Sequence, residues 1–123
     1  MRRILVVDDD TQIRHMLREI LEREGYEVAV AENGREALAL FDRHPTDLII
    51  TDLIMPEQDG VETIMEFTQK YPAVKIIAIS GGGRIGPRDY LEMATALGAR
   101  RTFYKPFKRQ DILTAVQELL AEG

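Results

Sequence analysis

The chain has 123 residues and no cysteine, and it carries a formal net charge of −5 at pH 7. One domain of this length can bury a single core, and the lack of cysteine excludes disulfides and thiolate chemistry. The negative charge argues against nonspecific binding to nucleic acids or anionic membranes. Because only four apolar residues follow Arg2 and Arg3, a signal peptide is not expected. We therefore expect a cytoplasmic protein with one domain over residues 1–123, with no membrane contact and no direct nucleic-acid binding.

Segments with strand-like and helix-like patterns alternate along the chain. Residues 4–7, 48–51 and 75–80 are continuous apolar or β-branched runs, which is typical of central parallel strands covered on both faces. Residues 26–31 and 101–105 are more polar, so we expect them at the edges of the sheet. The three runs and two mixed segments together predict a five-stranded parallel sheet.

Apolar residues recur at helical spacing after each predicted strand. Asn33 with Glu36, and Asp59 with Glu62, have the spacing of capping boxes. The predicted helices carry apolar stripes within residues 13–21, 37–41, 61–67, 90–97 and 112–120. Five βα units with strands two and five at the edges predict an α/β fold: a doubly wound, flavodoxin-like (βα)5 sandwich of strand order 2-1-3-4-5.

In such a sheet, ligands bind beyond the carboxyl ends of the strands, where the strand order reverses. Here that point lies between the first and third strands. The first strand is followed by Asp8, Asp9 and Asp10, and the third by Asp52. The fourth strand ends in Ser80 and the fifth in Lys105. We therefore expect these polar side chains to meet in one crevice.

Some of the acids have ordinary structural explanations. Asp10 fits the first turn of a helix, paired with Arg14 four residues on. Asp9 with Gln12 has the spacing of a capping box, which is the ordinary structural alternative for Asp9. Asp8 and Asp52 end buried strands and have no such explanation. Three carboxylates in one crevice need a cation, and oxygen ligands without cysteine favour Mg²⁺ or Mn²⁺.

Lys105 and Ser80 add an ammonium group and a hydroxyl to the predicted crevice. Each has a common alternative role, as a solvated lysine or a turn hydroxyl. A metal ion, an ammonium and a hydroxyl are, however, the groups that phosphoryl transfer requires. A carboxylate can serve as the covalent acceptor. Their convergence at one sheet edge favours phosphoryl chemistry.

The segments ILVVDDD, LIITDLIMPEQDG, IIAISGG and YKPF, in this order, resemble the receiver domain of two-component response regulators over the whole chain. The resemblance implies that Asp52 is phosphorylated by a sensor histidine kinase or a histidine phosphotransfer protein. It implies that Asp8, Asp9, Asp52 and the backbone carbonyl of Ile54 hold Mg²⁺, and that Ser80 and Lys105 contact the phosphoryl group. It also implies a cis bond before Pro106.

The sequence departs from the family pattern in two places. Thr102 stands where the family often has an aromatic residue that moves on phosphorylation, with Phe103 and Tyr104 following it. By strand alternation Phe103 should face the core and Tyr104 should face outward. The loop within residues 81–89 is longer than usual and spells G-x-G-x-x-G, but its place after the fourth strand argues against nucleotide binding.

Two other functions fit parts of the pattern. In a small metal-dependent phosphohydrolase, Asp8 would be the nucleophile and Asp10 the acid/base; the chain lacks the cap insertion that such an enzyme needs. A binding module without phosphorylation would not need the full acid set. Ile13 and Met16 fit either the core or a rim patch for a phosphodonor helix. The sequence does not identify the stimulus, the downstream target or the oligomeric state.

Overall fold

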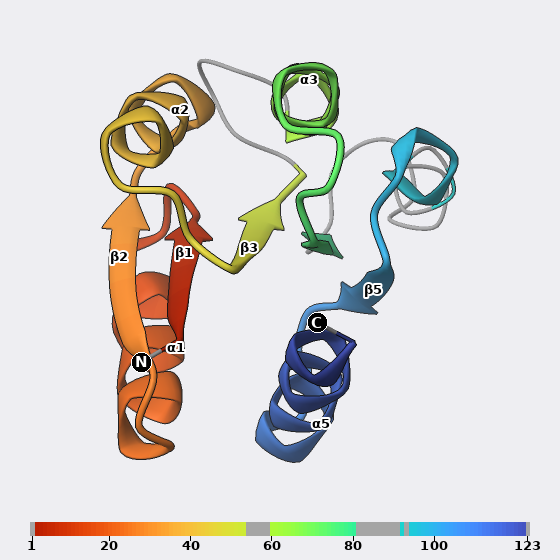
Figure 1. Cartoon of the computed structure of the whole chain (residues 1–123). Helices are drawn as coiled ribbons and strands as arrows, with labels where there is room; N and C mark the ends of the chain where they lie inside the picture. Colours follow the sequence, from red (N-terminus) through yellow and green to blue (C-terminus); the bar gives the residue numbers. More distant parts are fainter. Residues whose placement is uncertain (1, 54–59, 81–91, 93, 123) are drawn as a thin grey trace.

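The computed structural model describes residues 2–53, 60–80, 92 and 94–122. Strands and helices alternate along this chain (Figure 1). The strands are β1 (Arg3–Val7), β2 (Glu27–Ala31), β3 (Leu48–Asp52), β4 (Ile76–Ser80) and β5 (Arg101–Tyr104). The helices are α1 (Thr11–Arg23), α2 (Gly34–Arg43), α3 (Gly60–Lys70) and α5 (Arg109–Ala121). Residues 94–97, between β4 and β5, are also helical.

The five strands form one parallel sheet of order β2-β1-β3-β4-β5. This order confirms the predicted topology, with β2 and β5 at the edges. Every residue of β3 and β4 is buried, as their continuous apolar runs predict. The polar β5 has three partly buried residues and an exposed Tyr104.

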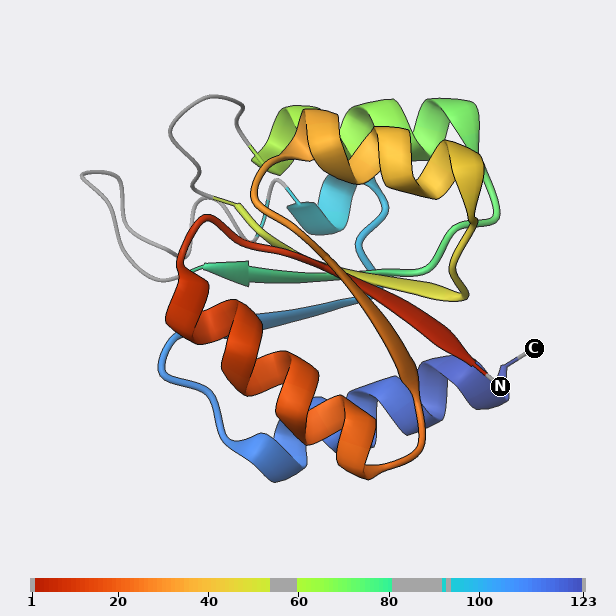
Figure 2. The same cartoon turned by 90° about the vertical axis from the view of Figure 1, so that its left-hand side faces the viewer.

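Helices cover both faces of the sheet, as Figure 2 shows, with α2 and α3 on one side and α1 and α5 on the other. Alternate strand residues therefore enter two separate cores. Ile4, Val6 and Ile50 pack in the core shared with α1 and α5. Leu5, Val7 and Ile49 pack in the core shared with α2 and α3. Because both faces are buried, the carboxyl edge of the sheet is where polar side chains can reach solvent.

Helix ends follow the sequence signals where the structure describes them. Asn33 caps α2 by accepting a hydrogen bond of 2.9 Å from the Glu36 amide through its side-chain oxygen. Gly25 and Gly98 have φ values of +89° and +119°, so both follow helical segments in the left-handed conformation that favours glycine. The expected cap at Asp59 and the loop within residues 81–89 lie outside the described residues.

Among the described residues, no helix combines the length and apolar character needed to cross a membrane.

Candidate metal centre

The pairing of β1 with β3 places two acids next to each other. Val7 lies opposite Thr51 in the parallel register, so the residues that follow them, Asp8 and Asp52, leave the sheet side by side. Both carboxylic residues are buried, with exposed fractions of 2% and 5%. The side chains of both acids are on the face of the sheet that α1 and α5 cover. In each strand, the residues two and four places earlier pack in the core on that face.

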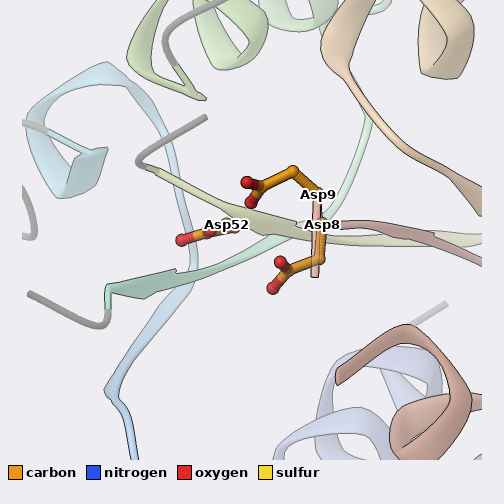
Figure 3. A group of neighbouring side chains, drawn as sticks. All are labelled: Asp8, Asp9 and Asp52. Atoms are coloured by element: carbon orange, nitrogen blue, oxygen red, sulfur yellow. The ribbon is translucent and has the colours of Figure 1, made fainter. Parts of the chain in front are cut away.

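Asp9 completes a group of three carboxylates at this edge. One carboxylate oxygen from each of Asp8, Asp9 and Asp52 lies within 4.8 Å of the others. Figure 3 shows the three carboxylates pointing toward the same space beyond the strand ends. Two oxygens bound to one Mg²⁺ are at most about 4.2 Å apart. Shifts below an ångström would therefore bring all three into contact with one ion, so this donor set fits a hard divalent cation.

Lys105 lies between the two buried acids. Its ammonium nitrogen is 3.0 Å from Asp8 Oδ2 and 3.4 Å from Asp52 Oδ2. Burial alone would lower the pKa of Lys105, but the carboxylates of Asp52 and Asp8 outweigh burial and raise this pKa above its ordinary value. Lys105 is therefore a fixed positive charge that partly compensates the acids.

Both carboxylate oxygens of Asp8 accept hydrogen bonds. Its Oδ1 accepts a hydrogen bond of 2.9 Å from the Asp10 amide, and its Oδ2 accepts from Lys105. Burial nevertheless raises the pKa of Asp8 above its ordinary value, and these hydrogen bonds oppose only part of that rise. Ionising Asp8 thus costs free energy in the folded protein, which a bound cation would offset.

Ser80 is fully buried at the end of β4. Its hydroxyl has no hydrogen-bond partner among the described residues. A buried hydroxyl without a partner is uncommon, because it loses its hydrogen bonds to water without replacement. A ligand bound at the carboxyl edge of the sheet would supply such a partner.

The structure corrects the expected roles of the acids that follow Asp8. The N-cap of α1 is Asp10, whose side chain accepts a hydrogen bond from the Gln12 amide at 2.9 Å. The alternative role of Asp9 as a helix cap is therefore wrong, and Asp9 is exposed among the three acids that could hold a metal ion. Asp10 lies outside that group and instead caps α1.

Arg14 does not form the predicted ion pair with Asp10. Its guanidinium instead donates to the backbone carbonyl of Asp8 at 2.6 Å and to Thr11 Oγ1 at 3.1 Å. Sequence spacing indicated only a contact along the helix, because a contact with a carbonyl outside the helix depends on how the chain turns after β1. Sequence reasoning missed this contact.

The remaining sequence predictions divide between core and surface. Phe103 packs against the core, whereas Tyr104 is 48% exposed, as strand alternation predicts. Ile13 packs against the core and Met16 is 39% exposed, so only Met16 is available for a rim patch. The bond between Lys105 and Pro106 is cis, which confirms that expectation. Ile54, whose carbonyl was expected to bind the metal, lies outside the described residues.

A family model describing the response regulator receiver domain matches residues 4–117. The chain is 36% identical over 119 residues to the chemotaxis protein CheY of Bacillus subtilis, covering 96% of this chain and 97% of CheY. It is 34% identical over 120 residues to the transcriptional regulatory protein CpxR of Klebsiella pneumoniae. That match covers 98% of this chain but 50% of CpxR, so the chain spans about half the length of this relative.

Solved structures agree with the sequence matches. A response regulator receiver domain protein from Clostridium thermocellum superimposes with a TM-score of 0.91 and 29% identity, covering 99% of this chain and 96% of that one. The response regulator TrrA from Thermotoga maritima, in complex with Mg²⁺ and BeF, gives a TM-score of 0.85 and 36% identity. The coverage is 97% of this chain and 99% of TrrA.

Proposed function

Because this chain belongs to the response regulator receiver domain family of two-component signal transduction, we propose that it is a switch phosphorylated on Asp52. The phosphoryl donor is a phosphohistidine on a sensor histidine kinase or a histidine phosphotransfer protein. Residues 1–123 form one receiver domain, located in the cytoplasm. The protein assists its own phosphorylation and dephosphorylation and does not turn over an external substrate.

The observation that carries this proposal is the gathering of Asp52, Asp8 and Asp9 around Lys105 at the carboxyl edge of the sheet. The Asp8 carboxylate is held by the Asp10 amide and by Lys105 at 3.0 Å. Asp52 lies at the tip of a central strand, farther from Lys105 at 3.4 Å, and in the same group as Asp8 and Asp9. The end of a buried strand gives Asp52 a fixed position from which to attack an incoming phosphorus atom.

Asp8, Asp9, Asp52 and the Ile54 carbonyl would hold Mg²⁺. Bound there, the ion would supply positive charge to the transferred oxygens and orient them. TrrA, a relative in this family, has been solved with Mg²⁺ and BeF.

The side chains perform the other parts of the transfer. A carboxylate oxygen of Asp52 forms the new bond to phosphorus while the bond from phosphorus to the donor imidazole nitrogen breaks. The imidazole leaves with that electron pair and takes up a proton from solvent. Lys105 stabilises the charge on the phosphoryl oxygens, and the Ser80 hydroxyl donates a hydrogen bond to one of them. Movement of Ser80 toward the phosphoryl group would then change the segment that follows β4.

Phosphorylation by a small donor tests the proposal and its enzymatic alternative together. The wild-type protein, Asp52→Asn and Asp8→Asn are incubated with acetyl phosphate and Mg²⁺, and intact mass and released phosphate are recorded. We expect one added phosphoryl group on the wild type and none on Asp52→Asn, with Asp8→Asn labelled more slowly. Phosphate release that continues in Asp52→Asn but stops in Asp8→Asn would instead support a phosphohydrolase.

A further inference from the structure

Arg14 connects helix α1 to the turn that carries the acids. One guanidinium nitrogen donates to the Asp8 carbonyl at 2.6 Å, and the other donates to Thr11 Oγ1 at 3.1 Å. The two contacts hold the guanidinium at both ends. A short hydrogen bond from a charged donor is stronger than one between neutral groups, and Arg14 is partly buried.

The carbonyl that Arg14 holds belongs to the peptide between Asp8 and Asp9. Other contacts fix the residues on either side: the Asp8 amide donates to the Ala31 carbonyl at 3.1 Å, and the Asp10 amide donates to Asp8 Oδ1 at 2.9 Å. Within the described part of the chain, Arg14 is the contact that anchors the oxygen of this peptide. Rotation of that peptide changes the direction of the Cα–Cβ bond of Asp9.

Asp9 depends on this anchor more than its two neighbours do. Asp8 and Asp52 are buried and contact Lys105. Asp9 is exposed, and among the described residues its carboxylate has no hydrogen bond that would orient it. The backbone is therefore what directs Asp9 toward the other two carboxylates.

We propose that Arg14 is a positioning residue for the divalent cation: it holds the Asp8–Asp9 peptide so that the Asp9 carboxylate faces Asp8 and Asp52. This inference rests on the proposed function, because it assumes that the three acids bind Mg²⁺. The charge of Arg14 alone would not favour cation binding, because a positive guanidinium near the site repels the cation. Positioning and charge therefore predict opposite effects when Arg14 is replaced.

The test measures Mg²⁺ affinity by calorimetry in the full chain, with Mn²⁺ binding followed by electron paramagnetic resonance as a second readout. Arg14→Met removes the contacts and the charge. Arg18→Met is the matched control, because Arg18 lies one turn later in α1 and pairs with Glu22 at 3.2 Å, outside the site. Arg14→Lys keeps the charge and one donor. Thr11→Val removes the hydroxyl that accepts from Arg14. This variant replaces Arg14→Met in the test if Arg14→Met does not fold.

We expect Arg14→Met to weaken Mg²⁺ binding about tenfold, the lower end of the usual effect of removing a residue that orients metal ligands. Arg14→Lys should restore part of the affinity, Thr11→Val should weaken binding less, and Arg18→Met should not weaken it. Unchanged or tighter binding in Arg14→Met, or equal losses in Arg14→Met and Arg18→Met, would overturn the role of Arg14. A wild-type protein that binds no Mg²⁺ would overturn the proposed function itself.

Discussion

Lys105 donates a hydrogen bond of 3.0 Å to Asp8 across 97 residues of sequence. The contact joins the turn after β1 to the end of β5, on opposite sides of β3 and β4 in the strand order. The same ammonium lies 3.4 Å from Asp52. In the metal-free protein, Lys105 is therefore a cation that compensates two adjacent buried carboxylates.

Lys105→Met is expected to destabilise the metal-free protein and to tighten Mg²⁺ binding. The substitution removes a positive charge that contacts both buried carboxylates. The expected loss is about 2 kcal/mol, between the values for exposed and fully buried ion pairs. Urea unfolding in chelator and a Mg²⁺ titration measure the two effects. Lys108→Met is the control, since Lys108 is exposed and makes no side-chain cap at α5; equal effects from both variants would contradict this account.

Asp8→Asn is expected to stabilise the metal-free protein at pH 7, because it removes a buried charge. Asparagine can still accept the hydrogen bond from the Asp10 amide, but it brings no charge into the buried site. Burial raises the pKa of Asp8 above 3.8, so the folded protein keeps this proton at pH values where the unfolded chain has lost it. The wild type therefore loses stability relative to Asp8→Asn as the pH rises through that interval.

Unfolding free energies in chelator across the acidic and neutral range test the sign of this effect. The advantage of Asp8→Asn should grow from about pH 4 upward and then become constant above the folded pKa. Asp9→Asn changes an exposed carboxylate instead of a buried one, so its effect on stability should be smaller. A difference between Asp8→Asn and the wild type that does not change with pH would count against burial as the cause.

Ser80→Ala is expected to leave the metal-free protein as stable as the wild type, or slightly more stable. The Ser80 hydroxyl is buried and has no hydrogen-bond partner among the described residues. Removing it therefore breaks no hydrogen bond with those residues. Thermal unfolding measures this effect. The same variant should respond more weakly to beryllofluoride in amide NMR spectra; lower stability with an unchanged response would show that the hydroxyl has a structural role instead.

Asn33→Ala is expected to cost about 1 kcal/mol of unfolding free energy, the usual value for loss of an N-cap. The Asn33 side chain accepts from the Glu36 amide at the start of α2, away from the acids. Asn33→Asp keeps an accepting oxygen and should retain most of the stability. Mg²⁺ affinity should be the same in all three proteins, which separates fold stability from the site.

The sequence allowed the sheet to be predicted because each strand had a distinct composition. Apolar runs marked β1, β3 and β4 as central, and the acids, Ser80 and Lys105 then fell at the carboxyl edge. The turn after β1 was not predictable in the same way. Asp9 and Asp10 both have helix-capping chemistry, and only the path of the chain decides that Asp10 caps α1 while Asp9 faces the site.

The Arg14 contact escaped prediction for a related reason. Sequence rules for charged pairs count residues along one helix, whereas Arg14 reaches a backbone oxygen that lies before α1 begins. Backbone acceptors carry no residue-specific signal. By contrast, the direction of Phe103 and Tyr104 followed from strand alternation alone.

A crystal structure with Mg²⁺ and beryllofluoride tests the central claim most directly. We expect the ion between Asp8, Asp9 and Asp52, the beryllium on a carboxylate oxygen of Asp52, and fluorine atoms near Ser80 Oγ and Lys105 Nζ. An empty site, or beryllofluoride on Asp8 in place of Asp52, would contradict the account.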